Sequence, residues 1–268
     1  MNIFDLADYY INNKNEFMGE DGHEKLLVGL KKYIKNINDN NTIIVGIDIG
    51  SCIGDYIFNI NEICKEENKK ILCFEPNPVN IIKLEEKIKE DKNLKLFKCC
   101  LSNENTIAPF YNLWLFNEND TGNQCAGLVS GGTKICDVDV KRLDDVLDSE
   151  FNNENIIIKY IKIDTEGNDA KIIKGFEKYL PKTKYILFEC SDCLNNSGVL
   201  NPMQDIVDFL SKNGFDTYRI GTKKLFKVND EYWNQVYEDV KFWSNCFSLK
   251  KDDGLIHELI DENFDYKY

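Results

Sequence analysis

The chain has 268 residues, 43% hydrophobic and 29% charged, which is the balance of a folded protein of one or two domains. Its 46 acidic side chains outnumber its 33 lysines and arginines, so the formal net charge is -13. Nucleic-acid binding needs clustered basic side chains, and the lysines here are scattered among acids, so we expect no nucleic-acid partner. No stretch approaches the roughly 20 apolar residues of a membrane span, and the N-terminus lacks a signal-peptide pattern. We therefore expect a cytoplasmic protein without a membrane partner.

The cysteine content points to reduced thiols. Ten cysteines without a secretory signal do not indicate a disulfide framework. Cys190 and Cys193 have the spacing of half a zinc site, but no second pair completes it. We therefore expect no metal site built on them.

The predicted elements begin with two short helices in the first 35 residues, the second of which carries Leu26, Leu27 and Leu30 at helical spacing. From residue 42 onward, short apolar runs alternate with amphipathic segments of helical period. This alternation is typical of strand-helix-strand units around a parallel sheet. The sequence therefore predicts a helical N-terminal extension at residues 1–41 and one α/β domain at residues 42–268.

Strands that are covered on both faces read as near-continuous apolar runs. We predict such strands at Ile43–Ile49, Ile71–Phe74, Leu94–Cys99, Tyr160–Ile163 and Tyr185–Glu189.

Helices are predicted to start after Asn77 and after Asn201, because each of these capping residues is followed by proline and then by apolar residues at helical spacing. Residues 107–116 resemble an added strand. Residues 120–133 form a long glycine-bearing segment, and long loops of this kind often contact a substrate.

The segment NTIIVGIDIGSCIGD, residues 41–55, runs from a predicted strand into a turn that contains Gly50 and Gly54. At the carboxyl edge of a parallel strand, a ligand can lie against glycine without meeting a Cβ atom, and backbone amides point toward it. Glycines also close purely structural turns, so this turn alone is weak support for a small-molecule site.

Glu75 strengthens the prediction of a nucleoside site. It ends the second predicted strand, about 25 residues after the glycine turn, where an acid can accept both hydroxyls of a ribose. The alternative is that Glu75 caps the turn or the helix that follows.

Two nucleoside cofactors fit such a sheet: a nicotinamide dinucleotide and S-adenosylmethionine. The dinucleotide motif G-x-G-x-x-G is absent, because the glycines here are four residues apart. Asp48 can accept the ammonium of an amino-acid end, and the amides around Ser51 and Cys52 can donate to its carboxylate. The residues therefore favour S-adenosylmethionine, and a nicotinamide-dependent oxidoreductase stays as the alternative.

A third cluster follows the strand YIKI. Asp164 stands at the end of this strand and Glu166 two residues later, while Glu189 ends the next strand. Strand ends of a parallel sheet converge on one crevice, so we expect these three acids to lie near each other. Their mutual repulsion requires a raised pKa, a bound cation, substrate hydroxyls or pairing with Lys162. Glu166 and Glu189 are equally compatible with simple capping roles.

The segments DIGSCIGD, FEPNP, LSNEN, VKRLDDVL, KIDTEGND and ILFEC, in this order within residues 48–190, resemble the FkbM-type S-adenosylmethionine-dependent methyltransferases. The resemblance implies a class I, Rossmann-like sheet of about seven mostly parallel strands with helices on both faces. It also implies methyl transfer, usually to oxygen, in families tied to glycans and small metabolites. Asp48, Gly50 and Gly54 would then hold the methionine end of the cofactor and Glu75 its ribose, with Ser102 near the adenine.

Further site residues are expected around these positions. The cofactor site is expected to include Ser51, Pro76, Asn77 and Asp164, and the acceptor site Lys162, Glu189, Tyr111 and Trp114.

A sugar hydroxyl is a poor nucleophile and needs a base, for which the candidates are Asp164, Glu166 and His23. His23 lies in the N-terminal extension, where a lid or structural role explains it better. The expected partner is a small-molecule or glycan acceptor, and self-association into a homo-oligomer stays open. Three alternatives also stay open: a metal-assisted small-molecule O-methyltransferase, an NAD-dependent oxidoreductase, and a non-catalytic module that binds S-adenosylmethionine.

Overall fold

The structure is a computed structural model that describes residues 3–17, 21–112, 126–128, 132–152, 154–189, 203–239 and 245–264. The chain forms two compact units. One contains the described residues of 36–184, and the other contains those of 1–35 together with those from Tyr185 onward. The domain boundary expected at residue 41 stays a prediction.

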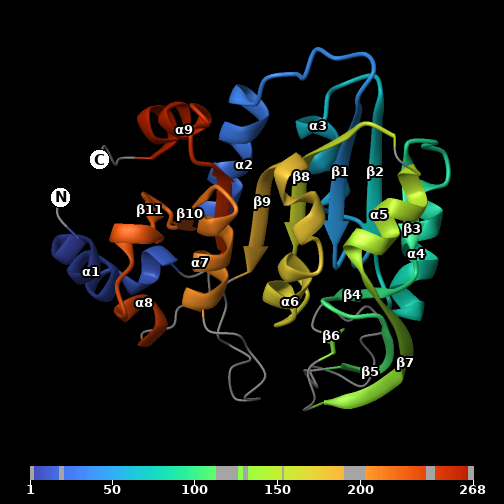
Figure 1. The fold of residues 1–268 in the computed structure, drawn as a ribbon. Helices are drawn as coiled ribbons and strands as arrows, with labels where there is room; N and C mark the ends of the chain where they lie inside the picture. Colours follow the sequence, from blue (N-terminus) through green and yellow to red (C-terminus); the bar gives the residue numbers. More distant parts are fainter. Residues whose placement is uncertain are drawn as a thin grey trace. The chain divides into compact units, whose positions relative to one another are not determined.

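The unit of residues 36–184 is built on parallel strands in the order β3-β2-β1-β8 (Figure 1). These strands are β1 (Ile43–Ile49), β2 (Lys69–Phe74), β3 (Leu94–Phe97) and β8 (Ile156–Ile163). β1 and β8 are buried over almost their whole length, which explains their near-continuous apolar sequences. The predicted strands are confirmed here, and the bounds of β1 match the prediction.

Helices connect these strands: α3 (Ile57–Ile63), α4 (Pro78–Ile88), α5 (Leu143–Phe151), α6 (Asp169–Lys174) and the 3-10 helix η2 (Glu177–Lys182). The predicted cap of α4 is confirmed, because the Asn77 side chain accepts a hydrogen bond from the amide of Val79 at 3.0 Å. Leu84 and Ile88 are among the α4 side chains that are buried.

A smaller sheet in the same unit has the order β4-β7-β5-β6. Its strands are β4 (Cys100–Ser102), β5 (Thr106–Asn112), β6 (Ala126–Gly127) and β7 (Thr133–Arg142). The added strand expected at residues 107–116 is confirmed as β5 over residues 107–112, and residues 113–116 lie outside the described residues. The strand expected to continue to Cys99 ends at Phe97, because the chain then leaves the parallel sheet and pairs with β7.

The other unit contains antiparallel strands in the order β9-β12-β10-β11. These are β9 (Thr183–Glu189), β10 (Phe215–Ile220), β11 (Leu225–Lys227) and β12 (Asn245–Lys250). Its helices are α1 (Ile3–Asn12), η1 (Lys14–Phe17), α2 (Asp21–Tyr33), α7 (Met203–Lys212), η4 (Asp230–Tyr232), α8 (Val236–Asp239) and α9 (Leu255–Asn263). The two N-terminal helices are thus confirmed, and so is the α/β class, although the number of strands differs from the expected one.

The N-terminal helices pack within this unit against the turn between β10 and β11. A Cβ atom at Gly22 would lie 2.7 Å from the carbonyl oxygen of Gly221, so glycine permits the close approach. The buried carboxylate of Glu16 accepts hydrogen bonds from the Tyr9 hydroxyl and from the amide of Lys223. None of the helices among the described residues is both long and apolar enough to cross a membrane.

Candidate functional site

The glycine turn begins directly after β1. The amides of Gly50 and Ser51 both donate to the carbonyl oxygen of Phe74, each at 3.0 Å, so the turn is tied to the end of β2. Gly50 and Gly54 have φ angles of +76° and +82°, in the left-handed region that favours glycine. The turn therefore needs glycine for its backbone conformation.

The space at these glycines is occupied by the protein itself. A Cβ atom at Gly50 would lie 1.9 Å from the carbonyl oxygen of Asp164, and one at Gly54 would lie 2.7 Å from Cδ1 of Leu84. The sequence interpretation has a ligand lying against the glycines. The structure adds a different requirement: the residue after β8 lies against Gly50, and a side chain of α4 lies against Gly54. The contacts of the two glycines with the cofactor stay predictions.

Glu75 joins the glycine turn to the start of α4. Its Oε2 atom accepts a hydrogen bond from the amide of Cys52 at 2.7 Å, and its Oε1 atom accepts one from the amide of Asn77 at 2.8 Å. Glu75 is only 4% exposed, and burial raises its pKa to about 7 despite these hydrogen bonds. Oε1 also accepts a hydrogen bond from the Asn80 side-chain amide at 3.5 Å, so the structural role is observed and Oε2 is the oxygen that retains acceptor capacity for a ribose hydroxyl.

A charged cluster lies where β1 and β8 end. Asp48 and Lys162 are opposite each other in the β1–β8 pairing. The Lys162 Nζ atom lies 3.6 Å from Asp48 Oδ1 and 3.3 Å from Asp164 Oδ2, and it donates a hydrogen bond to the carbonyl oxygen of Gly50 at 3.1 Å. One ammonium thus joins two carboxylates and the glycine turn.

The two carboxylates of this cluster differ in exposure. Asp48 is 0% exposed, and neither of its carboxylate oxygens has a hydrogen-bond partner within the described part of the chain. Burial raises the pKa of Asp48, and the nearby charge of Lys162 opposes this shift. Burial alone lowers the pKa of Lys162, but Asp164 and Asp48 outweigh it and raise that pKa. The Asp164 side chain is 46% exposed, so it is the carboxylate of the cluster that a ligand can reach.

Tyr56 and Tyr160 complete this cluster, and neither was among the expected site residues. Their hydroxyls share a hydrogen bond of 2.8 Å, and the Lys162 ammonium lies 5.5 Å from the centre of the Tyr56 ring. The sequence carried a signal for Tyr160, because Tyr160 and Lys162 alternate in β8 and share one of its faces, and Asp164 continues the same alternation directly after the strand. Tyr56 precedes α3 and has no comparable signal.

The turn after β8 presents Glu166. This residue has a φ angle of +56° and is followed by Gly167 at +101°, so the chain reverses tightly between β8 and α6. Strand β6 lies against this turn, because a Cβ atom at Gly127 would be 3.2 Å from the carbonyl oxygen of Thr165. Tyr111 of β5 pairs with Gly127. The small sheet thus brings an aromatic residue expected at the acceptor site next to the strand that contacts this turn.

The remaining expected residues are placed as follows. Pro76 is partly buried between Glu75 and the cap of α4. Glu189 ends β9 and His23 lies in α2, both in the other compact unit, so their meeting with Asp164 stays a prediction. Trp114, Cys190 and Cys193 lie outside the described residues. Among the described residues, no group of three or more His, Cys, Asp or Glu side chains is placed to hold a metal ion.

Ser102, expected near the adenine, ends β4 and is 5% exposed. Its carbonyl oxygen lies against α6, since a Cβ atom at Gly175 would be 2.2 Å away. Its hydroxyl donates a hydrogen bond to Asn103 Oδ1 at 3.3 Å.

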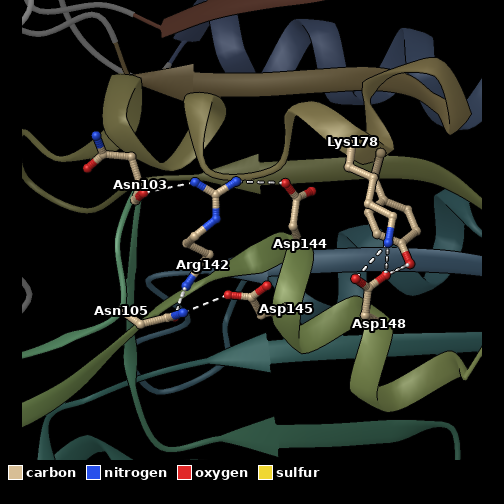
Figure 2. A network of polar contacts seen from close by, with 8 residues as sticks. Asn103, Asn105, Arg142, Asp144, Asp145, Asp148 and Lys178 are labelled. Carbon is tan, nitrogen blue, oxygen red and sulfur yellow. Dashed lines mark hydrogen bonds and ion pairs between the residues drawn. The ribbon is translucent and has the colours of Figure 1, made fainter.

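Arg142 fixes the turn that follows Ser102 (Figure 2). Its guanidinium donates to the carbonyl oxygen of Asn103 and to Asp144 Oδ2, both at 3.0 Å, and its amide donates to Asn105 Oδ1 at 2.8 Å. Because Asp144 stands in the first turn of α5, the network anchors the turn after β4 to the start of that helix.

Together, the parallel order β3-β2-β1-β8, the glycine turn after β1 and the acid after β2 define a class I, Rossmann-like methyltransferase fold. The family model of the methyltransferase FkbM domain matches residues 48–217. The chain therefore belongs to the FkbM methyltransferase family, and its cofactor is S-adenosylmethionine.

Several solved structures are similar to this chain at low identity. A methyltransferase FkbM from Methylobacillus flagellatus KT is 11% identical with a TM-score of 0.44, and the match covers 92% of this chain and 59% of that chain. An rRNA methylase from Streptococcus thermophilus is 12% identical with a TM-score of 0.42, over 84% of this chain and 93% of that one. Fibrillarin from Aeropyrum pernix, with natively bound S-adenosyl-L-methionine, is 8% identical with a TM-score of 0.41, and the match covers 84% of this chain and 74% of that chain.

The chain spans less than two thirds of the Methylobacillus protein, since 59% of that chain is covered. No curated protein matches the sequence.

Proposed function

We propose that this protein is an S-adenosylmethionine-dependent O-methyltransferase whose acceptor is a sugar hydroxyl on a glycan, a nucleotide sugar or a small metabolite. The observation that carries the proposal is the position of Asp164. This half-exposed carboxylate stands at the carboxyl end of β8, beside the glycine turn and the buried Asp48–Lys162 pair. Strand ends at this edge of a parallel sheet are where ligands bind.

The residues around the glycine turn fit the cofactor. The carboxylates of Asp48 and Asp164 outnumber the one ammonium of Lys162, so the cluster has an unbalanced negative charge suited to a cationic ligand. Glu75 Oε2 retains acceptor capacity for a ribose hydroxyl beyond the amide of Cys52, whereas Oε1 already accepts from Asn77 and Asn80. When bound, the cofactor supplies an electrophilic methyl group.

The chemistry left to the protein is positioning and proton removal. Methyl transfer needs the acceptor oxygen in line with the bond that breaks, so positioning supplies much of the rate. Asp164 or Glu166 takes the proton of the hydroxyl onto a carboxylate oxygen as the new bond forms. The left-handed conformation of Glu166 and the contact of Gly127 with this turn hold the second carboxylate next to the small sheet.

The acceptor assignment is supported by charge and by the small sheet. A net charge of -13 disfavours polyanionic acceptors, whereas an uncharged hydroxyl tolerates a carboxylate-lined site. Tyr111, which pairs with Gly127, offers an aromatic face near the turn that carries Glu166. We assign the acceptor site to this side of the small sheet.

The test is methyl transfer from isotopically labelled S-adenosylmethionine to a panel of free sugars, nucleotide sugars and RNA, with the product mapped by NMR. We expect a labelled methyl ether on a sugar, and a loss of kcat in Glu166→Gln while S-adenosylhomocysteine still binds. Asp145→Asn, in the surface network of Figure 2, is the matched control with unchanged kcat. Labelling of RNA or of an amine, with no sugar product, would contradict the proposal.

A further inference from the structure

Lys162 is buried and serves several acceptors at once. Its side chain is 9% exposed, and its ammonium contacts Asp48 of β1, Asp164 after β8 and the carbonyl oxygen of Gly50 in the turn. The ammonium therefore connects the ends of β1 and β8 to the glycine turn, and the cofactor is assigned to this region.

The buried carboxylate of Asp48 explains why a cation is needed at the position of Lys162. Asp48 has no exposed surface, and a buried carboxylate must be paired or take up a proton. Within the described residues, Asp48 has an ion pair with Lys162 and no hydrogen bond to either carboxylate oxygen. Because Asp48 is covered, it can influence a ligand only through its neighbours, and Lys162 is the neighbour that also touches the exposed Asp164.

We propose that Lys162 is a positioning residue of the cofactor site: held by Asp48, it fixes the Asp164 carboxylate and the Gly50 carbonyl where the amino-acid end of S-adenosylmethionine binds. This inference rests on the proposed function for the identity of the ligand. The exposed Asp164 carboxylate and the Gly50 carbonyl are acceptors suited to the ammonium of that end. Lys162 orients them without being a catalytic residue.

Two ligands separate this role from a purely structural one. S-adenosylhomocysteine and 5'-methylthioadenosine share the adenosine and the thioether, but 5'-methylthioadenosine lacks the amino-acid end. Both are titrated calorimetrically into the wild-type chain and into Lys162→Met. We expect Lys162→Met to bind S-adenosylhomocysteine about tenfold more weakly, the factor of one charge-assisted hydrogen bond, and 5'-methylthioadenosine within about twofold of wild type.

Lys69→Met is the matched control. Lys69 also donates to backbone carbonyls in this unit, those of Cys64 at 2.8 Å and Asn61 at 3.2 Å, but at the opposite end of the sheet. Its loss should leave the ratio of the two affinities unchanged. Lys162→Arg keeps the charge and should recover part of the affinity for S-adenosylhomocysteine.

A double-mutant cycle tests the link from Asp48 to Lys162, and Asp48→Asn alone tests it if Lys162→Met folds poorly. Asp48→Asn alone should lower the affinity for S-adenosylhomocysteine and spare 5'-methylthioadenosine. Adding Lys162→Met should then cost little more, because both changes remove the same arrangement.

The outcomes are distinguishable. Equal weakening of both ligands by Lys162→Met, or full additivity of the two variants, overturns the inference and leaves the proposed function standing. A wild-type chain that binds neither ligand overturns the cofactor assignment, and this inference with it.

Discussion

The buried carboxylate of Glu75 makes cofactor binding sensitive to pH near neutrality. Burial raises the pKa of Glu75 to about 7, from an ordinary value of 4.5. If the ribose hydroxyls bind to the ionised carboxylate, the apparent dissociation constant rises by the factor 1 + 10^(pKa − pH). Lowering the pH from about 8 to about 6 then weakens binding about tenfold, or about 1.4 kcal/mol.

The assay is calorimetric titration of S-adenosylhomocysteine at both ends of this range. Glu75→Gln keeps the size of the side chain and one acceptor but cannot ionise, so its affinity should be lower and independent of pH. The pKa of Asp48 is also raised, so Asp48→Asn is the second control and should keep the slope of the wild type. A wild-type affinity that does not change with pH, or a Glu75→Gln variant with the wild-type slope, would refute the ribose assignment.

Three further predictions follow from the contacts around the site. Gly50→Ala should fail to fold, or its free energy of unfolding should fall by several kcal/mol, because its Cβ atom would lie 1.9 Å from the Asp164 carbonyl oxygen at a φ of +76°. Circular dichroism and thermal melting measure this, and a stable, native-like variant contradicts it. Lys159→Met should lower the free energy of unfolding in urea by roughly 3 kcal/mol, because Glu66, paired with Lys159 at 2.6 Å, would keep a buried charge; adding Glu66→Gln should restore most of the loss. Gly127→Val should raise the KM for the acceptor by about tenfold or more while S-adenosylhomocysteine binds normally, because a side chain there presses on the turn of Glu166. An equal loss of affinity for the acceptor and for S-adenosylhomocysteine would argue against an acceptor site there.

The parts of the fold that the sequence predicted are those set by local patterns. Strand β1 was predictable because both of its faces are buried, which leaves an apolar run from Ile43 to Ile49 interrupted only by Gly46 and Asp48. Helix α4 was predictable because the Asn77 cap and the proline after it are local signals. The end of β3 was not, because whether residues 98 and 99 continue the strand depends on the pairing of β4 with the distant β7.

The candidate site was predictable as a set of residues but not as an arrangement. The glycine turn, Glu75 and Asp164 stand out in the sequence because of their position after apolar runs. The reason that Gly50 must be glycine, contact with the Asp164 carbonyl, joins residues far apart in the chain and is invisible in a local pattern. Pairing of Lys162 with the acids of the third cluster was among the expectations, and its ammonium does contact Asp164. Its contacts with Asp48 and the Gly50 carbonyl join residues far apart in the chain, and its place at the acceptor site stays a prediction.

The pairing of β1 with β8 shows how this arrangement depends on one residue. Ile43, Ile44 and Val45 pair with Ile156, Ile157 and Ile158, but Gly46 pairs with Tyr160, so the register skips Lys159. Without this shift, Asp48 would stand opposite an isoleucine, and the buried carboxylate would have no cation beside it. Because a bulge re-aims every side chain after it, the skipped residue places Lys162 opposite Asp48. The skipped residue, Lys159, lies in the middle of β8, where it is buried and paired with Glu66, so the bulge that aligns Lys162 with Asp48 also places a second buried lysine beside an acid.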